Sequence, residues 1–256
     1  MAKLNTLIKR ATRPEHGPMG FGAAARKPQA SMLLVAIIGD HWPRAVSDAA
    51  AAGADVLVLQ GKPGDKDISE AIAAAGDQPC GVMLSDTSLD ALPRLREAKV
   101  DFVLVGANSP AAALMEEELA VVLQLREELS DVQLRTLEAW PFGAIYFDRE
   151  SAPATIFKLL DLQRVAGLAR KPLMVQIPAD TKQGELMALR DAGVALLAVD
   201  MKDRSAIDSL KRLRETVDAL PRHKPRKEEK REAWLPSGGS GAMSEHGEEE
   251  EEDDRG

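Results

Sequence analysis

The sequence predicts an α/β fold in which eight parallel strands, each followed by a helix, close into a (βα)8 barrel. From Met32 to Leu220, a short apolar run alternates eight times with a helix-forming run rich in alanine and leucine. Most of the apolar runs are continuous, as in parallel strands covered on both faces. An open doubly wound sheet is the main alternative, and eight strands without an antiparallel signal favour closure.

The eight predicted strands are short apolar runs of five to seven residues. They are Met32–Ile38, Asp55–Gln60, Cys80–Leu84, Asp101–Val105, Leu119–Leu125, Gly143–Phe147, Leu173–Ile177 and Ala195–Val199. The predicted helices lie between them, at Arg44–Ala52, Ile68–Ala75, Leu89–Ala98, Ala111–Glu117, Ser130–Trp140, Ala154–Ala169, Gly184–Ala192 and Ala206–Ala219. The run from Leu119 also has helical spacing, and the regularity of the other units favours a strand there.

A weak internal repeat supports the barrel. The segments that begin at Ala52, Ala98 and Ala192 share one pattern, in which a helix ends and a strand begins one or two residues later. In the first and third, the helix ends at Gly53 or Gly193, and glycine adopts the left-handed conformation that terminates helices. Such short helix-to-strand loops build a parallel sheet through right-handed crossovers.

The composition predicts one folded domain with two extensions. Residues 1–31 form an N-terminal segment and a tether, residues 32–220 form the barrel, and residues 221–256 form a charged, disordered tail. With 45% hydrophobic residues, the chain has ample material for one core. The segment MAKLNTLIKRATRP is short, basic and mildly amphipathic, and we expect it to close the N-terminal face of the barrel.

The tail is strongly patterned in charge. Residues 221–231 hold six basic and two acidic residues, and residues 245–256 hold eight acidic residues and one arginine. Such blocks repel themselves and have little to bury. The tail is therefore expected to be solubilising, to bind a basic protein partner, or to fold back on its own basic run. Nucleic-acid binding is not expected, because aromatic residues are missing from the basic run.

The sequence also indicates a compartment. No apolar stretch approaches the length of a membrane span, and the first residues lack the apolar core of an export signal. Cys80, the only cysteine, lies in a strand run and reads as a small buried hydrophobe. A reducing cytoplasm fits these features.

In barrels of this kind the functional site lies at the carboxyl ends of the strands. Four aspartates end or follow neighbouring strands there, namely Asp148, Asp180, Asp200 and Asp40. Converging carboxylates of this kind are ligands for Mg²⁺ or Mn²⁺, which would activate a carbonyl or an enolate. The alternative is that each aspartate only caps the helix that follows it.

Other residues at the same end are candidates for acid–base chemistry and for substrate binding. His41 and Lys62 are the candidate acid and base. The candidate substrate-binding residues are Gln60, Ser85, Asn108 and Gln176. The two glutamines end apolar strands, where a polar group must be hydrogen-bonded, either to a ligand or to a loop.

Several chemistries are excluded by what the barrel segment lacks. His41 is its only histidine, so a zinc site built from several histidines or cysteines is not expected. The segment has no phosphate-binding P-loop, dinucleotide motif or nucleophile elbow. No lysine lies inside a strand run, where a Schiff-base lysine would be held.

The helix–Gly–Ala–Asp–strand phrases and the late segment KPLMVQIPADTKQGELMALRDAGVALLAVDM resemble the aldolase-type, phosphate-binding group of TIM barrels. The resemblance spans about Met32 to Leu220. It implies a phosphate held by backbone N–H groups after the seventh and eighth strands. At those positions Pro178 has no N–H group and Asp200 adds negative charge, so these residues argue against a phosphate site.

Two functions follow. The first is binding of a small polar metabolite, or metal-assisted catalysis of lyase or isomerase type, at the carboxyl-terminal mouth of the barrel. The second is a barrel without catalysis that serves as an assembly or regulatory protein through its charged tail. One fold hosts many chemistries, so the residues at the mouth must decide between these functions.

Overall fold

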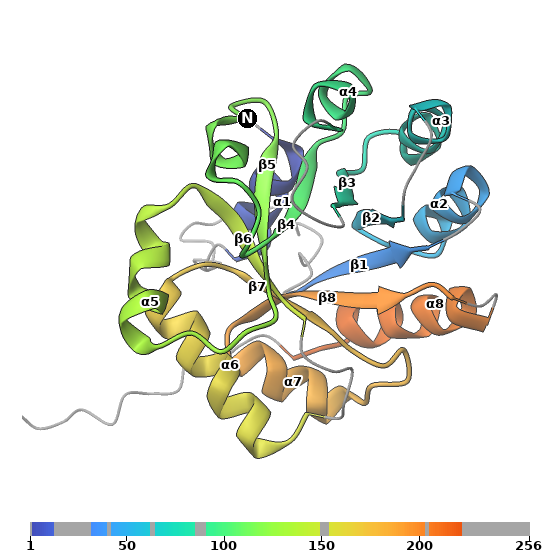
Figure 1. The fold of residues 1–256 in the computed structure, drawn as a ribbon. Coiled ribbons are helices and arrows are strands. Elements are labelled where there is room, and N and C mark those ends of the chain that lie inside the picture. The colour runs from blue at the N-terminus through green and yellow to red at the C-terminus, as the bar shows by residue number, and fades with distance from the viewer. Residues whose placement is uncertain are drawn as a thin grey trace, which may run out of the picture. The chain divides into compact units, whose positions relative to one another are not determined.

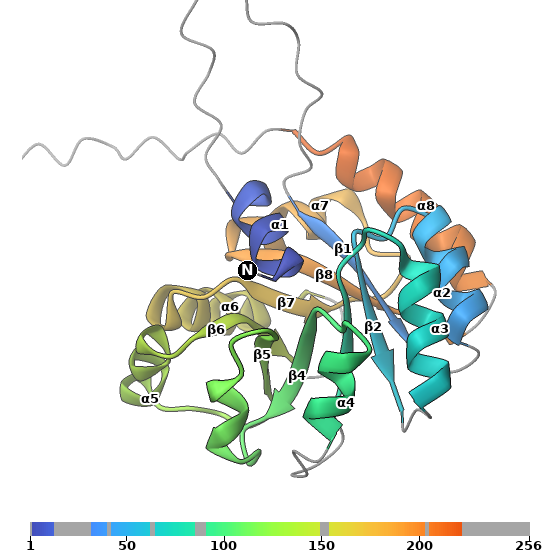
Figure 2. The ribbon, with the colours of Figure 1, turned by 90° about the horizontal axis from the view of Figure 1, so that it is seen from above.

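The computed structural model is a closed barrel of eight parallel strands in the order β1 to β8, with β8 paired to β1. It describes residues 2–12, 32–39, 42–61, 65–84, 91–148, 154–202 and 205–221. The helices stand outside the ring of strands (Figures 1 and 2). The predicted closed barrel is thereby confirmed, and the open sheet is excluded. Of the predicted N-terminal segment and tether, residues 2–12 are described. Of the predicted tail, only residue 221 is described.

The strands lie close to the predicted runs. They are β1 Leu33–Ile38, β2 Val56–Gln60, β3 Cys80–Met83, β4 Phe102–Gly106, β5 Ala120–Leu125, β6 Phe142–Phe147, β7 Leu173–Gln176 and β8 Val194–Asp200. The helices are α1 Lys3–Ala11, α2 Trp42–Ala51, α3 Asp65–Ala75, α4 Leu92–Glu97, α5 Asp131–Thr136, α6 Ile156–Ala169, α7 Gln183–Asp191 and α8 Ser205–Asp218. The ambiguous fifth run is a strand, paired with β4 and, with one register shift between Val121 and Val122, with β6.

Two predicted helices differ in the structure. The run from Ala111 forms a short 3-10 helix, η2 (Ala111–Met115), because its chain turns extended at Glu116 to enter β5. The helix predicted over Ser130–Trp140 is divided into α5 and a second 3-10 turn, η3 (Leu137–Ala139). Ser130 caps α5 through a reciprocal pair of hydrogen bonds with Gln133.

The internal repeat in the sequence is matched by a repeat in backbone conformation. Gly53 and Gly193 have φ angles of +97° and +95° at the ends of α2 and α7, as the repeat predicts. Lys99 occupies the matching position after α4 and adopts φ of +62°, in the left-handed region that is uncommon for residues with a side chain. The turn geometry is thus kept in the second copy, where lysine takes the place of glycine.

The side chains form two apolar layers. Strand residues that point outward, such as Leu34, Val103 and Leu197, are buried between the barrel and its helices. Residues that point inward, such as Val35, Leu104 and Met174, fill the barrel interior. The interior is therefore a packed core in its lower part and not a channel. Cys80 is buried in the outer layer, and burial, with a smaller contribution from Asp101, raises the pKa of its thiol to about 12.

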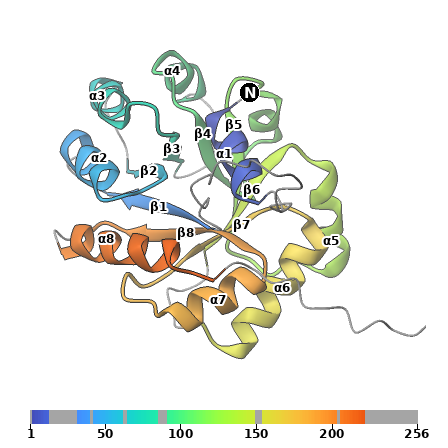
Figure 3. The ribbon, with the colours of Figure 1, turned by 180° about the vertical axis from the view of Figure 1, so that it is seen from behind.

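Helix α1 closes the N-terminal end of the barrel, as the sequence predicts (Figure 3). Leu4 and Ile8 of α1 are buried against the interior residues. The carboxylate of Asp101, just before β4, accepts hydrogen bonds from the backbone N–H groups of Lys3 and Leu4, at 2.6 and 2.8 Å. An acid at a helix N-terminus is favourable, so Asp101 both caps and anchors α1.

Gly81 gives a direct test of the interior packing. A Cβ atom at Gly81 would overlap the ring of Phe102, which is fully buried in the barrel interior. We expect Gly81→Ala to lower the free energy of unfolding by about 1–3 kcal/mol, because overpacking forces neighbours to shift. Phe102→Leu should cost less in the Gly81→Ala background than in the wild type. Urea unfolding of both single variants and the double variant measures this coupling, and strictly additive losses would contradict it.

Among the described residues, no helix is long and apolar enough to cross a membrane.

Candidate functional site

The uppermost layer of the barrel interior is polar, in contrast to the apolar layers below it. Side chains alternate along a strand, so inward positions follow Val122, Ala144, Met174 and Ala198 at intervals of two residues. In β5 to β8 and directly after them, this alternation places six polar side chains at the carboxyl-terminal mouth. They are Gln124, Arg126, Tyr146, Asp148, Gln176 and Asp200.

Asp148 is held by two donors from β5 and its end. The amide nitrogen of Gln124 donates to Oδ2 of Asp148 at 2.7 Å, and Nε of Arg126 donates to the same oxygen at 2.9 Å. Gln124 is only 5% exposed, while Arg126 is exposed at the rim. One cationic donor and one neutral donor therefore fix the carboxylate at the mouth.

Tyr146 lies below this carboxylate, within the interior core. Its hydroxyl donates a hydrogen bond to Oε1 of Gln176 at 3.0 Å. Burial, and then the negative charges of Asp148 and Asp200, raise the pKa of Tyr146, against a smaller lowering by Arg126. The phenol therefore stays protonated at neutral pH, where it serves as a hydrogen-bond donor.

Asp200 ends β8 on the other side of Gln176 in the barrel. Its Oδ2 pairs with Nζ of Lys202 at 2.8 Å, and the lysine side chain is largely exposed. Asp148 follows β6 and Asp200 ends β8, both at inward positions of the alternation, and the charge of each raises the pKa of Tyr146. The mouth over β5 to β8 thus offers two carboxylates, one phenol donor and two cations.

The structure brings together three of the ten site residues predicted from the sequence, namely Asp148, Asp200 and Gln176. Three others are exposed: Gln60 at the end of β2, Asn108 in the turn after β4, and Asp180 in the turn after β7. The remaining four, Asp40, His41, Lys62 and Ser85, lie outside the described residues. Each of them follows one of the first three strands in the sequence.

The alternative of simple helix capping fails for two aspartates. The N-cap of α6 is Thr155, whose hydroxyl accepts a hydrogen bond from the N–H of Lys158. The N-cap of α7 is Lys182. Asp148 and Asp180 therefore do not cap the helices that follow them.

The metal prediction stays a prediction. Within the described part of the chain, no three His, Cys, Asp or Glu side chains lie close enough together to hold a metal ion. Asp148 and Asp200 are each paired with a cation. Asp40, which follows β1 in the sequence, lies outside the described residues, so the structure describes three of the four predicted ligands.

Sequence analysis did not select Gln124, Tyr146 or Arg126. A signal existed for two of them. Gln124 is a polar residue inside an otherwise apolar strand run, and Tyr146 is the only tyrosine of the chain. Both lie within strands, whereas most of the residues predicted from the sequence follow strands.

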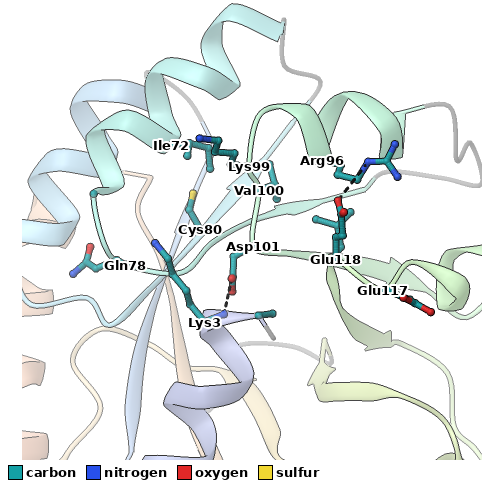
Figure 4. Close-up of a pocket in the computed structure, with 13 residues that line it drawn as sticks. Lys3, Ile72, Gln78, Cys80, Arg96, Lys99, Val100, Asp101, Glu117 and Glu118 are labelled. Atoms are coloured by element: carbon teal, nitrogen blue, oxygen red, sulfur yellow. Dashed lines mark hydrogen bonds and ion pairs between the residues drawn. The ribbon is translucent and has the colours of Figure 1, made fainter.

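A cavity of about 510 Å³ lies at the opposite end of the barrel, beside the start of α1 (Figure 4). Three of its charged groups are engaged in structure. Asp101 caps α1, and Nε of Arg96 pairs with Glu118 at 3.6 Å. In this fold the N-terminal face serves stability and the carboxyl-terminal face serves function. We therefore place the candidate site at the mouth and not in the cavity at the base.

No protein-family model and no curated protein sequence matches the chain. Solved structures do. A 3-hexulose-6-phosphate synthase has a TM-score of 0.57 and 18% identity, over 72% of this chain and 99% of that one. The HpcH/HpaI aldolase of Desulfitobacterium hafniense DCB-2 has a TM-score of 0.53 and 12% identity, over 76% and 95%. A tryptophan synthase α-subunit from Pyrococcus furiosus has a TM-score of 0.54 and 15% identity, over 73% and 97%.

These similarities confirm the resemblance to aldolase-type TIM barrels at the level of the fold. At such identities they carry the architecture alone, because one barrel fold hosts unrelated reactions.

Proposed function

We propose that the carboxyl-terminal mouth of the barrel binds a small polar metabolite and acts on it by lyase-type or isomerase-type chemistry. The observation that carries this proposal is the polar layer of Gln124, Tyr146, Asp148, Gln176 and Asp200 above an otherwise apolar interior. Apolar side chains at these positions would avoid the desolvation of two carboxylates, so folding alone gives no reason for the polar layer. Departures of this kind from good packing are typical of functional sites.

The donors and acceptors at the mouth define the ligand class. The carboxylates of Asp148 and Asp200 accept hydrogen bonds, which suits hydroxyl groups on the ligand. The cations of Arg126 and Lys202 donate, which suits a carbonyl or a carboxylate, and the hydroxyl of Tyr146 would add a donor on releasing Gln176. We therefore propose a hydroxy-carbonyl or hydroxy-acid metabolite.

The same groups fit proton transfer beside a carbonyl. A carboxylate, for which Asp200 is our choice, would remove a proton from the carbon next to the carbonyl. The Lys202 ammonium would donate hydrogen bonds to the oxygen as negative charge develops on it, and the Tyr146 hydroxyl would do so on releasing Gln176. His41 and Lys62, which follow β1 and β2 in the sequence, remain candidates for the partner acid. Two of the similar structures are named a synthase and an aldolase, which agrees with this reaction class.

A metal-assisted form of the proposal rests on Asp148 and Asp200, whose charges both raise the pKa of the Tyr146 phenol. With Asp40, which follows β1 in the sequence, these carboxylates would hold Mg²⁺ or Mn²⁺, which would polarise the carbonyl of the ligand. This form requires Arg126 and Lys202 to release their carboxylates. A rise in melting temperature with Mg²⁺ alone would support it, and no response to Mg²⁺ or Mn²⁺ would favour the metal-free form.

Thermal stability of the full chain tests the binding proposal. We expect some member of a panel of hydroxy acids, keto acids and short sugars to raise the melting temperature. At about ten times its Kd, a ligand adds about 1.4 kcal/mol, or about 3–6 °C for a domain of this size. Asp200→Asn should abolish the shift, because it removes the carboxylate charge while keeping the shape of the side chain.

Asp208→Asn is the matched control, because Asp208 lies exposed on α8. It should keep the full shift. A ligand that stabilises the Asp200→Asn variant equally would bind elsewhere and would contradict the proposed site. Failure of the whole panel would favour the alternative of an assembly or regulatory protein.

A further inference from the structure

Helix α6 carries large apolar side chains on its outer surface. The exposed fractions are 76% for Ile156, 85% for Phe157 and 57% for Leu160. The opposite side of the helix is also apolar, with Leu162, Val165 and Ala169 buried against the barrel. A surface helix of a soluble protein normally has one apolar stripe and one polar face, and a helix apolar on both sides is normally covered on both.

The neighbouring helix extends this surface. Val132, in the first turn of α5, is 71% exposed. Helices α5 and α6 lie side by side (Figures 1 and 2) and are joined by Arg164, which binds Asp131 at 2.7 Å and the carbonyl of Leu129 at 2.8 Å. Val132 follows Asp131 and Leu160 precedes Arg164 by one turn, so this ion pair links the two exposed regions.

We propose that Ile156, Phe157, Leu160 and Val132, here called the α6 surface, form the contact between two copies of this chain. The area agrees with a dimer. From the exposed fractions, the four side chains present on the order of 500 Å² of apolar surface, near the upper end for a patch on a monomer. A stable interface buries about 800 Å² on each partner, of which roughly three fifths is apolar. The α6 surface supplies the apolar part.

The charges around the surface favour a copy of itself as the partner. In a two-fold interface, each patch meets an identical patch, so a rim of one sign would repel itself. Here the rim holds both signs, with Arg164 between Asp131 and Asp161. A membrane surface, by contrast, selects an apolar face flanked by an excess of lysine and arginine. The balanced rim therefore suits self-association better than lipid binding.

The outer stripe of α6 also continues without charge. Gln163 and Gly167 continue the exposed stripe of α6 beyond Leu160, at helical spacing. An added Cβ at Gly167 would meet no atom within 4 Å, so that position is open. A helix of a second copy can approach closely there without burying an unpaired charge.

Sedimentation of the full chain over about 1–100 µM tests the proposal, a range in which standard-size interfaces of moderate affinity are populated. We expect the wild type to sediment with twice its monomer mass of 27.6 kDa. Phe157→Glu should weaken self-association by at least about 100-fold, because a central aromatic side chain is a typical hot spot and is changed in both copies. Leu160→Glu should act in the same direction.

Met115→Glu is the matched control, since Met115 is 70% exposed on η2, between β4 and β5. It should leave the dimer intact. Circular dichroism should show all three variants folded, because each altered side chain is exposed in the monomer; should Phe157→Glu not fold, Ile156→Ser replaces it. A wild type that stays monomeric over the whole range would overturn the proposal. A dimer that survives both α6 substitutions would assign the contact to another surface and overturn it equally.

Discussion

Replacing Arg214 by methionine is expected to lower the free energy of unfolding by about 3 kcal/mol at neutral pH, because it leaves the buried Asp55 without its cation. Nη1 of Arg214, on α8, donates to Oδ2 of Asp55 at 2.8 Å, and the N–H of Leu34 donates to the same oxygen at 2.8 Å. Both charged side chains are mostly buried. This carboxylate therefore ties the last helix to the first two strands, across 159 residues of sequence.

The loss should depend on pH in a defined direction. Burial raises the pKa of Asp55 above the ordinary 3.8, against lowering by the Leu34 N–H group and by Arg214. A raised pKa means that the folded state binds the proton more tightly than the unfolded state. Ionisation of Asp55 therefore weakens folding as the pH rises from 3.8 through the folded pKa. Without Arg214 the pKa rises further, so the variant should lose more stability at neutral pH than near pH 4.

Urea unfolding of the wild type and of Arg214→Met at both pH values measures this difference. Arg212→Met is the control, because Arg212 is exposed on the same helix, and its cost should stay within about 0.5 kcal/mol. The stem of Arg214 also packs closely on Gly53. Equal losses at both pH values would assign the effect to that packing and would refute the role of the ion pair.

The architecture was predictable because it depends on local patterns. Each strand run is mostly apolar and each helix run is rich in good helix formers, and the eight units share one rhythm. The wrong prediction at Ala111 has a local cause as well. Alanine favours helix, but residues 107–119 form the shortest connection between successive strands, and tertiary demand overrides propensity. The pair of Asp55 and Arg214 was not predictable, since no local pattern relates two such distant positions.

The candidate site was predictable only in part. The rule that function follows the carboxyl ends of the strands found Asp148, Gln176 and Asp200. It also selected Asn108 and Asp180, which are exposed in turns. The reason is that a strand buried on both faces does not reveal which of its alternate positions point into the barrel. The sequence therefore does not show that Gln124 and Tyr146 point inward.

Helix α1 is part of the barrel core. Truncating the side chains that pack it there should lower the free energy of unfolding more than any other substitution proposed above. Leu4 and Ile8 are buried against the inward side chains of the strands, and Asp101 holds the helix in place through two N–H groups. Truncating a buried leucine or isoleucine to alanine costs about 2–5 kcal/mol, because contacts are lost and a cavity remains. The double variant Leu4→Ala/Ile8→Ala should therefore lose about 4–8 kcal/mol, comparable to the 5–15 kcal/mol that a whole domain has.

We expect this double variant to be partly unfolded at room temperature, as measured by circular dichroism and by urea unfolding. Lys9→Ala is the matched control on the same helix, because Lys9 is exposed and its truncation removes no core contact. Its stability should stay within about 0.5 kcal/mol of the wild type. A loss below about 1 kcal/mol in the double variant would contradict the assignment of α1 to the core, because no well-packed pair of buried side chains is truncated at so small a cost. The barrel interior would then have to be stable with its N-terminal end open.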